Sequence, residues 1–512
     1  MGTGADSGHD KRAAQATPTD AQTTGANSAL DQRQAGILLH PTSLPGPGPS
    51  GDLGHAAYRF VEFLAASGMG IWQTLPLGPT HTDGSPYQCL SVHAGNAELI
   101  SLDWLVDRGW LAKAKPAQRG RCLGEAYRAF AAARPKQGRS ELHAAHDAFV
   151  EDEGDWLEDY ALYAALRAEQ GGRRWLEWPA DLRDRDPAAL AGARERLADE
   201  IAQVRFEQFV FFRQWSELRR YAHEHGVRMF GDMPIFVAHD SAEVWAHREY
   251  FAIDEHGKAQ AVAGVPPDYF SATGQRWGNP HYRWKRMKAD GFKWWIRRMH
   301  TQLELFDLIR VDHFRGFEAY WEIPADAETA MQGRWVKAPG KALLSALYNA
   351  FDALPLVAED LGVITAPVEA LRRRFALPGM KILQFAFGGG PDNPYLPHNH
   401  EPDSVVYTGT HDNDTTLAWY RSLDADTRAY IGDYLGHPKD RMPWPLIRSA
   451  LASVARLAVV PMQDVLGLGA GHHMNRPGTT EGNWGWRFTW DQVAPDLAAR
   501  LNHLTGLYGR RG

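Results

Sequence analysis

Cysteine is scarce in this sequence of 512 residues, and long apolar runs and an excess of basic charge are absent from it. The two cysteines, Cys89 and Cys122, are too few for a disulfide framework and are typical of a reducing compartment. No apolar run approaches the roughly 20 residues of a membrane-spanning helix, and residues 1–34 lack the apolar core of a secretory signal. The 55 basic and 62 acidic residues give a net charge of -7, which argues against the basic surface of a nucleic-acid-binding protein. We therefore expect a cytoplasmic protein whose partners are neither nucleic acid nor membrane.

Residues 1–34 differ in composition from the rest of the chain. They are rich in Ala, Thr, Gly and Asp and contain almost no large apolar side chain. Packing such a segment cannot offset the entropy lost on ordering it. We expect residues 1–34 to form a disordered tail and residues 35–512 to fold.

Short apolar runs alternate with amphipathic helical stretches from residue 36 onward. Because the runs are nearly continuous, they indicate strands buried on both faces, as in a parallel sheet. Eight can be identified: GILLHPTS (36–43), IWQTLPL (71–77), RMFGDMPIFV (228–237), LIRVDHF (308–314), LVAED (356–360), KILQFAF (381–387), SVVYTGT (404–410) and LAVVPMQDVL (457–466). The helix pattern before the third strand stops at Gly226.

Eight strands with helical crossovers predict an α/β fold, a (β/α)8 or TIM barrel. The fifth-to-sixth and sixth-to-seventh spacings, 25 and 23 residues, suit one strand and one helix. The second-to-third spacing of 157 residues is far longer, so we expect a helical subdomain at 100–205. A loop subdomain is expected at 246–290, where the segment 261–284 is rich in Pro, Gly and aromatic residues. No separate C-terminal domain is expected.

Polar residues gather where these strands end, which is where the catalytic groups of a barrel lie. Arg310 and Asp312 are two apart on one strand, so they project to the same side. We expect the arginine to lower the pKa of Asp312 and keep it ionised, while the apolar run before Glu359 raises the pKa of that carboxyl. Two carboxyl groups with separated pKa values form the acid and nucleophile pair of glycoside cleavage.

Other interpretations of these residues exist. An Asp at a strand end is often a helix cap or a structural ion pair, and His411–Asp412 or His472–His473 could belong to a metal site. The further ligands that a metal needs are not evident at suitable spacing, and no GxGxxG or P-loop pattern supports nucleotide binding. We expect neither a metal nor a cofactor.

The chain resembles the amylomaltases, bacterial 4-alpha-glucanotransferases or disproportionating enzymes of glycoside hydrolase family 77. The resemblance covers nearly all of the chain from residue 36 onward, in the order of the family. It rests on the motifs GILLHPTSLPG (36–46), DGSPYQ (83–88), GDMPIFVAHDSAEVW (231–245), GVPPDYFSATGQRWGNPHYRW (264–284), IRVDHFRG (309–316), VAEDLG (357–362), NPYLPHNH (393–400), YTGTHDNDT (407–415) and MNRPGTTEGNWGWR (474–487). The chain departs from the family pattern at 47–50, at 91–97 and at Gly388, which bears on chain-length preference.

The resemblance implies roles for individual residues. Asp312 resembles the nucleophile that forms a covalent glucosyl-enzyme, Glu359 the general acid and base, and Asp412 the third carboxylate, which grips hydroxyls of the sugar. Further contacts with the glucan are implied for Ser85, Tyr87, Asp232, Asp268, Tyr269, Phe270, Arg310, His313 and His411.

The implied activity is retaining transfer of an α-1,4-glucan segment from a maltodextrin to the 4-hydroxyl of another glucan. We expect Tyr269 and Phe270 to form an acceptor site that limits the access of water. The alternatives are a glucan hydrolase on the same scaffold and, in another class, a catalytically silent glucan-binding protein. A silent protein should lack at least one of the three carboxylates, and all three are present. A glucan phosphorylase would need a pyridoxal-phosphate lysine site, which we do not find.

Overall fold

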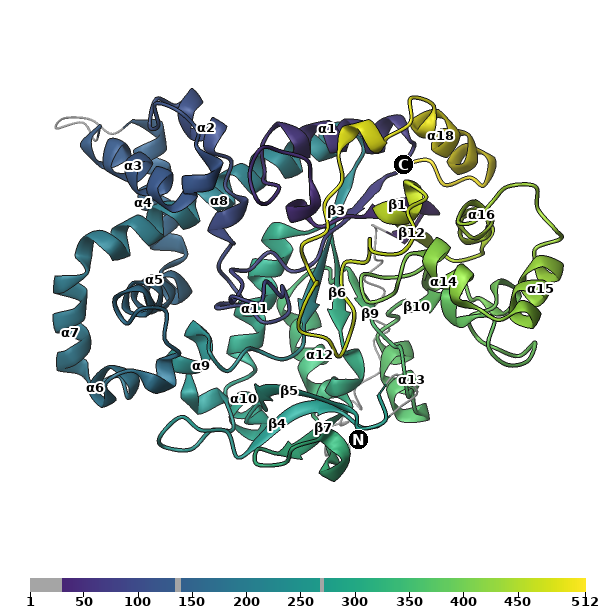
Figure 1. Ribbon diagram of the computed structural model, residues 1–512. Helices are drawn as coiled ribbons and strands as arrows, with labels where there is room; N and C mark the ends of the chain where they lie inside the picture. The colour runs from purple at the N-terminus through teal and green to yellow at the C-terminus, as the bar shows by residue number, and fades with distance from the viewer. Residues whose placement is uncertain (1–29, 134–139, 268–270) are drawn as a thin grey trace, which may run out of the picture.

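Each of the eight apolar runs forms a parallel strand in the computed structural model, which describes residues 30–133, 140–267 and 271–512 (Figure 1). The strands are β1 (Gln34–Leu38), β2 (Ile71–Gln73), β3 (Arg228–Pro234), β6 (Leu308–Asp312), β9 (Leu356–Ala358), β10 (Gly379–Ile382), β11 (Ser404–Tyr407) and β12 (Leu457–Pro461). They pair in the order β10-β11-β12-β1-β2-β3-β6-β9. The strands at the two ends of this order, β10 and β9, also approach each other. The amide of Ala358 in β9 donates to the carbonyl of Pro378, directly before β10, at 2.9 Å, so the barrel is nearly closed. The predicted barrel is confirmed.

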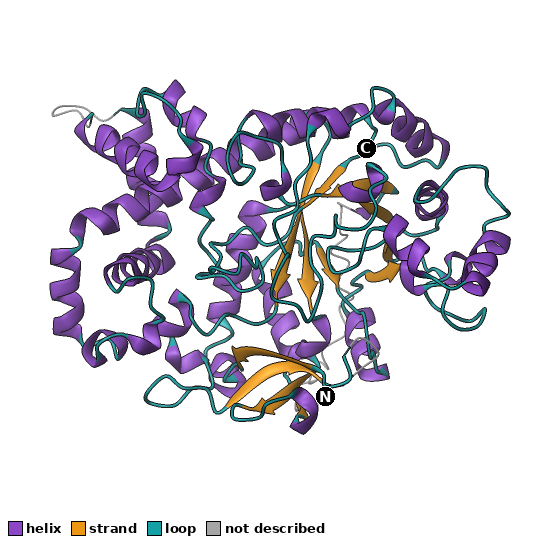
Figure 2. Cartoon of the chain, viewed as in Figure 1, coloured by secondary structure: helices purple, strands orange, loops and turns teal. Residues whose placement is uncertain are grey.

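Helices cover the outside of the barrel (Figure 2). Helices α1 (His55–Ala66) and α13 (Ala366–Arg374) come after β1 and β9, whereas α11 (Lys293–Leu305) and α12 (Gly340–Ala350) come before β6 and β9. Three helices separate β11 from β12: α14 (Thr416–Ser422), α15 (Ala425–Tyr434) and α16 (Trp444–Ala452). Short α17 (Met462–Val465) and α18 (Leu497–Leu507) follow β12. The Asn502 side chain, on α18, donates to the Ala66 carbonyl at the end of α1, so this last helix packs on the barrel.

One expected crossover helix is missing. The sixth-to-seventh spacing was interpreted as a strand plus a helix, but between β10 and β11 the structure has only short 3-10 turns at Leu383–Phe385 and Pro397–Asn399. The intervening sequence GGGPDNPYLP explains the difference, because glycine and proline both disfavour a helix interior.

The long connection from β2 to β3 is helical. It contains α2 (Leu102–Asp107), α3 (Arg119–Ala132), α4 (Glu141–Asp152), α5 (Gly154–Glu169), α6 (Ala180–Arg183), α7 (Pro187–Arg196) and α8 (Ala198–Glu224). Helix α8 has 27 residues, so the expected boundary at residue 205 falls inside it. Gly226, with φ +73, ends this element in the left-handed region that glycine adopts without strain.

A second, antiparallel sheet lies beside the barrel, at the bottom of Figure 1. It has the order β5-β4-β7-β8, from β4 (Ala261–Val265), β5 (Gln275–Pro280), β7 (Ala319–Pro324) and β8 (Arg334–Lys337). Helices α9 (Ala242–Ala246) and α10 (Trp284–Ala289) flank the first hairpin in sequence. The segment 261–284 was expected to be a loop, but it contributes two of these strands. Its Gly, Asn and Pro residues hide the strand pattern, and β5 is an edge strand, where such residues are tolerated.

The two ends of the described chain meet at the barrel. Leu30 and Gln34 are buried, and the exposed Arg33 donates to the carbonyls of Leu451 and Ser453, so the segment 30–34, predicted to belong to the tail, is attached to the barrel. Arg510 is completely buried. Its guanidinium donates to five main-chain carbonyls, those of Gln34, Leu451, Ser453, Ala455 and Arg456. Within the described ranges, no helix is long and apolar enough to span a bilayer.

Candidate active site

A cleft of about 500 Å³ opens at the carboxyl ends of the barrel strands. Its lining includes Asp312 at the end of β6, Glu359 directly after β9, and Asp412 in the loop after β11. Val311 pairs with Ala358 across β6 and β9, so Asp312 and Glu359 follow side by side on neighbouring strands. The three carboxylates that the sequence singled out therefore share one cleft.

A buried arginine organises the floor of the cleft. Asp232 of β3 pairs in register with Arg310 of β6, and this register places the carboxylate beside the guanidinium. Arg310 Nη1 donates to both Asp232 oxygens, at 2.8 and 2.7 Å, and its Nη2 lies 2.9 Å from Asp312 Oδ1. Two carboxylates thus compensate one buried cation, and Asp312 is held by a charge-assisted contact.

The electrostatics of Asp312 differ from our expectation. Burial raises the pKa of Asp312, and the charge of Arg310 opposes that rise without reversing it. The physical reason is that Arg310 shares its charge with Asp232, whose own negative charge raises the pKa of Asp312 further. The side chain of Asp312 keeps 29% of its surface exposed to the cleft, so one oxygen is held and the carboxylate stays accessible.

Glu359 is held by main-chain donors and forms no ion pair among the described residues. The His313 amide donates to Oε2 at 2.7 Å, and the Leu361 amide donates to Oε1 at 2.9 Å. His313 can aim its amide at the carboxylate because its backbone is left-handed, with φ 53. Burial is the largest influence and raises the pKa of Glu359 to about 7, as the apolar run before it led us to expect.

The pKa of Asp412 is shifted in the opposite direction to that of Glu359. Burial acts to raise its pKa, but His411 and Asn475 together lower it to about 2. Asn475 Nδ2 donates to Oδ1 at 2.7 Å, and His411 Nε2 lies 3.3 Å from Oδ2. An ionised carboxylate with oxygens at the cleft surface is an acceptor for sugar hydroxyls.

Three rings form a wall next to Asp412. Tyr87 stacks on His411 with ring centroids 5.1 Å apart, and Trp484 lies 5.9 Å from Tyr87. The Tyr87 hydroxyl donates to Asp232 Oδ2 at 2.8 Å, which ties this wall to the Arg310 cluster. Ser85, two residues earlier, also lines the cleft and accepts a hydrogen bond from the Tyr87 amide.

The structure brings most of the predicted site residues together. Of the predicted glucan contacts, Ser85, Tyr87, Arg310 and His313 line the cleft, and Asp232 and His411 contact residues that line it. Asp268, Tyr269 and Phe270 lie outside the described residues. Further residues line the cleft that were not predicted as glucan contacts, among them Trp277, Trp335, Asn475 and Trp484. Of these, Trp277, Asn475 and Trp484 belong to quoted motifs, which could have found them, whereas Trp335 belongs to none.

Asp360, next to Glu359, and His472 have structural partners. Asp360 accepts from the Met380 amide at 2.7 Å and pairs with Arg372, and His472 Nδ1 accepts from the Trp486 indole. In the described part of the chain, no group of three or more His, Cys, Asp or Glu side chains could hold a metal ion.

Comparisons with known proteins show the family of this chain. A family model described as 4-alpha-glucanotransferase matches residues 39–492. The chain is 52% identical over 493 residues to the 4-alpha-glucanotransferase of Thermus thermophilus, covering 92% of this chain and 98% of that protein. It is 48% identical over 499 residues to the 4-alpha-glucanotransferase of Synechocystis sp., covering 94% and 99%.

Solved structures include similar folds. The amylomaltase from Streptococcus agalactiae in complex with acarbose has a TM-score of 0.89 at 35% identity, covering 94% of this chain and 100% of that chain. The amylomaltase from Corynebacterium glutamicum, at 18% identity and a TM-score of 0.73, covers 96% and 77% and shares the fold.

Proposed function

The chain belongs to the 4-alpha-glucanotransferase family, and on that premise we propose how its cleft transfers a glucan segment. The substrate is an α-1,4-glucan such as a maltodextrin, and the reaction is a double displacement with retention at the anomeric carbon. The observation that carries this proposal is the placement of two carboxylates with different partners on neighbouring strands, Asp312 against a guanidinium and Glu359 against main-chain amides.

In the first displacement, Glu359 donates its proton to the glycosidic oxygen while an oxygen of Asp312 attacks the anomeric carbon. The bond to the leaving glucan breaks, that glucan departs with a new 4-hydroxyl, and the donor part stays attached to Asp312 as an ester. Arg310 keeps Asp312 oriented through its 2.9 Å contact. The raised pKa of Glu359 suits it to hold a proton near neutral pH.

In the second displacement, ionised Glu359 takes the proton of an acceptor 4-hydroxyl. The acceptor oxygen attacks the anomeric carbon, the ester bond breaks, and Asp312 regains its negative charge. Asp412 binds ring hydroxyls of the donor sugar and favours its distorted form, and the Tyr87–His411–Trp484 wall supports that sugar. Asp232 acts through Arg310 and Tyr87 as a positioning residue.

The products formed from maltotriose alone test this proposal. Transfer yields glucose together with a ladder of longer oligomers on thin-layer chromatography, whereas a hydrolase yields only shorter sugars. We expect Asp312→Asn to abolish turnover. We expect Glu359→Gln to accumulate a glycosyl-enzyme, detectable by mass spectrometry, when the donor carries a leaving group that needs no acid. Wild-type rates in Asp312→Asn, or an inverted anomeric product by NMR, contradict the mechanism.

Two expectations from the sequence stay predictions. Retention requires about 5–5.5 Å between the carboxyl groups of Asp312 and Glu359, against roughly 6.5–9.5 Å for inversion. A cytoplasmic location is expected from the scarcity of cysteine.

A further inference from the structure

Trp335 is a large aromatic residue that none of the steps above uses. It lies on β8, the outer strand of the antiparallel sheet, and 39% of its surface is exposed. It nevertheless lines the same cleft as Asp312 and Glu359. A single exposed apolar side chain is ordinary on a protein surface, but an exposed indole that lines a glucan cleft is placed to contact a sugar.

The Trp335 ring is fixed in place before any ligand binds. The Arg315 guanidinium carbon lies 3.6 Å from its centroid, in cation–π contact. Trp321, its register partner on β7, packs edge-on with ring centroids 5.1 Å apart, and the Trp321 indole is anchored on the Ala330 carbonyl at 2.9 Å. A side chain that is already ordered loses little entropy on binding a ligand.

A chain of contacts places Trp335 on the side of the cleft that belongs to Glu359. Arg315 stacks on Trp335 and donates to the Val363 carbonyl. Val363 lies two residues after Leu361, whose amide holds Glu359 Oε1 at 2.9 Å. Arg315, Leu361 and Val363 themselves line the cleft, so these contacts run along its wall.

The proposed mechanism assigns the side of Glu359 to the leaving and acceptor glucans. Glu359 protonates the oxygen of the departing glucan and later deprotonates the acceptor, so leaving and acceptor units occupy the side of Glu359. A loop separates Glu359 from Trp335, and we therefore expect a single acceptor glucose at the reacting position not to reach the indole. A longer acceptor extends along the cleft towards it.

Resting on the proposed transfer function, we propose that Trp335 forms a remote acceptor subsite, which stacks on a glucose unit of an α-1,4-glucan beyond the reacting one. Arg315 covers one face of the indole, so the apolar face of the glucose ring stacks on the other, and burial of these two faces excludes water. Among the described residues, the Trp335 indole N–H has no hydrogen-bond partner, so it is available to a sugar hydroxyl. Trp335 then selects for longer acceptors without touching the reacting atoms.

The test measures acceptor length dependence in the full-length protein. A donor with a good leaving group loads Asp312, and transfer to glucose, maltose, maltotriose and maltopentaose is followed by chromatography. For Trp335→Ala we expect the acceptor KM of the longest acceptor to rise about 3- to 10-fold, the range expected for losing one ring contact. The KM for glucose and the rate of leaving-group release should stay unchanged, and Trp335→Phe should keep most of the preference for long acceptors.

The control is Met331→Ala, which removes an exposed apolar side chain near β8 that does not line the cleft. It should leave all acceptors unaffected. The alternative is that Trp335 only supports the loop 361–363 that holds Glu359. That alternative predicts equal losses with glucose and with long acceptors, together with slower leaving-group release.

Equal losses at every acceptor length, or no loss at any length, overturn the Trp335 subsite while leaving the transferase proposal intact. A wild-type protein that produces only hydrolysis overturns the transferase proposal, and the subsite proposal with it.

Discussion

The carboxylates of Asp312 and Glu359 must be in opposite protonation states for the first displacement, and their surroundings predict a bell-shaped pH profile. Asp312 must be ionised, and because burial raises its pKa, kcat/KM should fall as the pH drops towards that raised value. Glu359 must be protonated, so kcat/KM should fall again as the pH rises above about 7. The two groups lie on adjacent strands, so the apparent values belong to the pair. The measurement is kcat/KM for maltotriose between pH 4 and 9; a rate that keeps rising to pH 9 contradicts the assignment of Glu359 as the acid.

Asn475 supports Asp412 through a 2.7 Å hydrogen bond, and a single substitution tests that support. A hydrogen bond to a charged group contributes about 1.5–3 kcal/mol, so Asn475→Ala should lower kcat/KM about 10- to 100-fold. The thermal stability should change little, since Asn475 lies in an exposed loop. Asn502→Ala is the matched control, because it removes an amide from the far side of the barrel. Equal activity of Asn475→Ala and wild type would show that Asp412 needs no such partner.

At the level of elements, the N-terminal segment has two parts that should behave differently on truncation. Deleting residues 1–29 should leave the free energy of unfolding almost unchanged, because their composition offers little apolar surface. Deleting residues 1–33 also removes the buried Leu30 and the two hydrogen bonds of Arg33. We expect that deletion to cost about 2–4 kcal/mol. Urea denaturation of the two truncated proteins measures the difference, and equal stability would show that Leu30 contributes nothing.

The barrel strands were predictable from the sequence because burial on both faces leaves near-continuous apolar runs, as in β12, where all five residues are buried. The antiparallel sheet was not, since β8 exposes three of its four residues and β5 contains Gly278 and Pro280. The same limit applies to the site. Asp312 and Glu359 follow recognisable strands, whereas Trp335 lies on a strand with no apolar pattern, and its approach to the cleft depends on tertiary pairing with β7. Asn475 meets Asp412 only through the folding back of the loop after β12.

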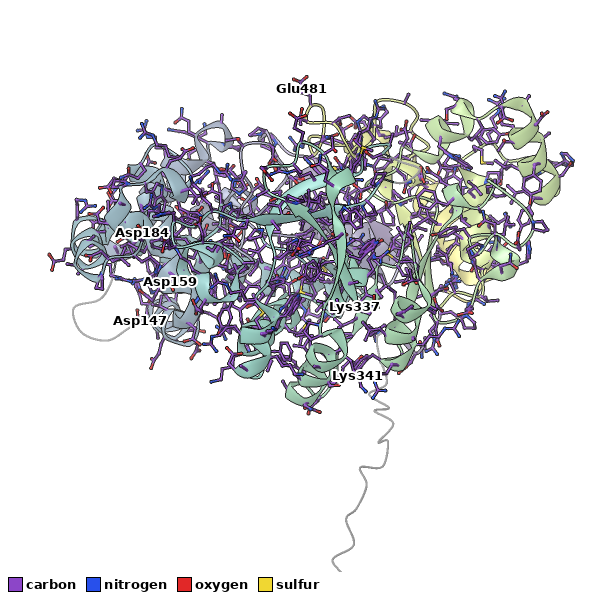
Figure 3. All side chains as sticks on the ribbon, turned by 90° about the horizontal axis from the view of Figure 1, so that it is seen from below. Asp147, Asp159, Asp184, Lys337, Lys341 and Glu481 are labelled. Atoms are coloured by element: carbon purple, nitrogen blue, oxygen red, sulfur yellow. The ribbon has the colours of Figure 1, made fainter. Side chains whose placement is uncertain are left out.

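The helical region and the loop that follows β12 reach the surface on different sides of the molecule (Figure 3). Figure 3 shows Asp147, Asp159 and Asp184 of the helical region together on one side, while Glu481, in the loop that follows β12, projects from another edge. Asn475 and Trp484 lie in this same loop, so one segment forms both a wall of the site and part of the outer surface.

Arg510 joins segments that are far apart in the sequence, so its substitution should lower the free energy of unfolding. Its guanidinium donates to five buried carbonyls that include those of Gln34 and Arg456, at the starts of β1 and β12. Arg510→Met should destabilise the protein by about 3–5 kcal/mol, because several carbonyls lose their donor in a place that water does not reach. The neighbouring exposed Arg511→Met is the control and should stay within about 0.5 kcal/mol of wild type. Thermal unfolding of both variants compares them, and similar melting temperatures would exclude a role for Arg510.

The pairing of β1 with β12 has a consequence for the order of events during synthesis. β1 is the first barrel strand to be made, and one of its edges has no partner until Leu457–Pro461 emerge. The carbonyl of Gln34 gains its hydrogen bond only after Arg510, 476 residues further along the chain, has been made. Contacts so distant in sequence form slowly, and an unpaired strand edge is a site of wrong association. The nascent chain therefore has an unpaired edge on β1 for almost the whole of translation. Slower translation or a lower temperature should change the yield of native protein more than it changes the stability of the folded barrel.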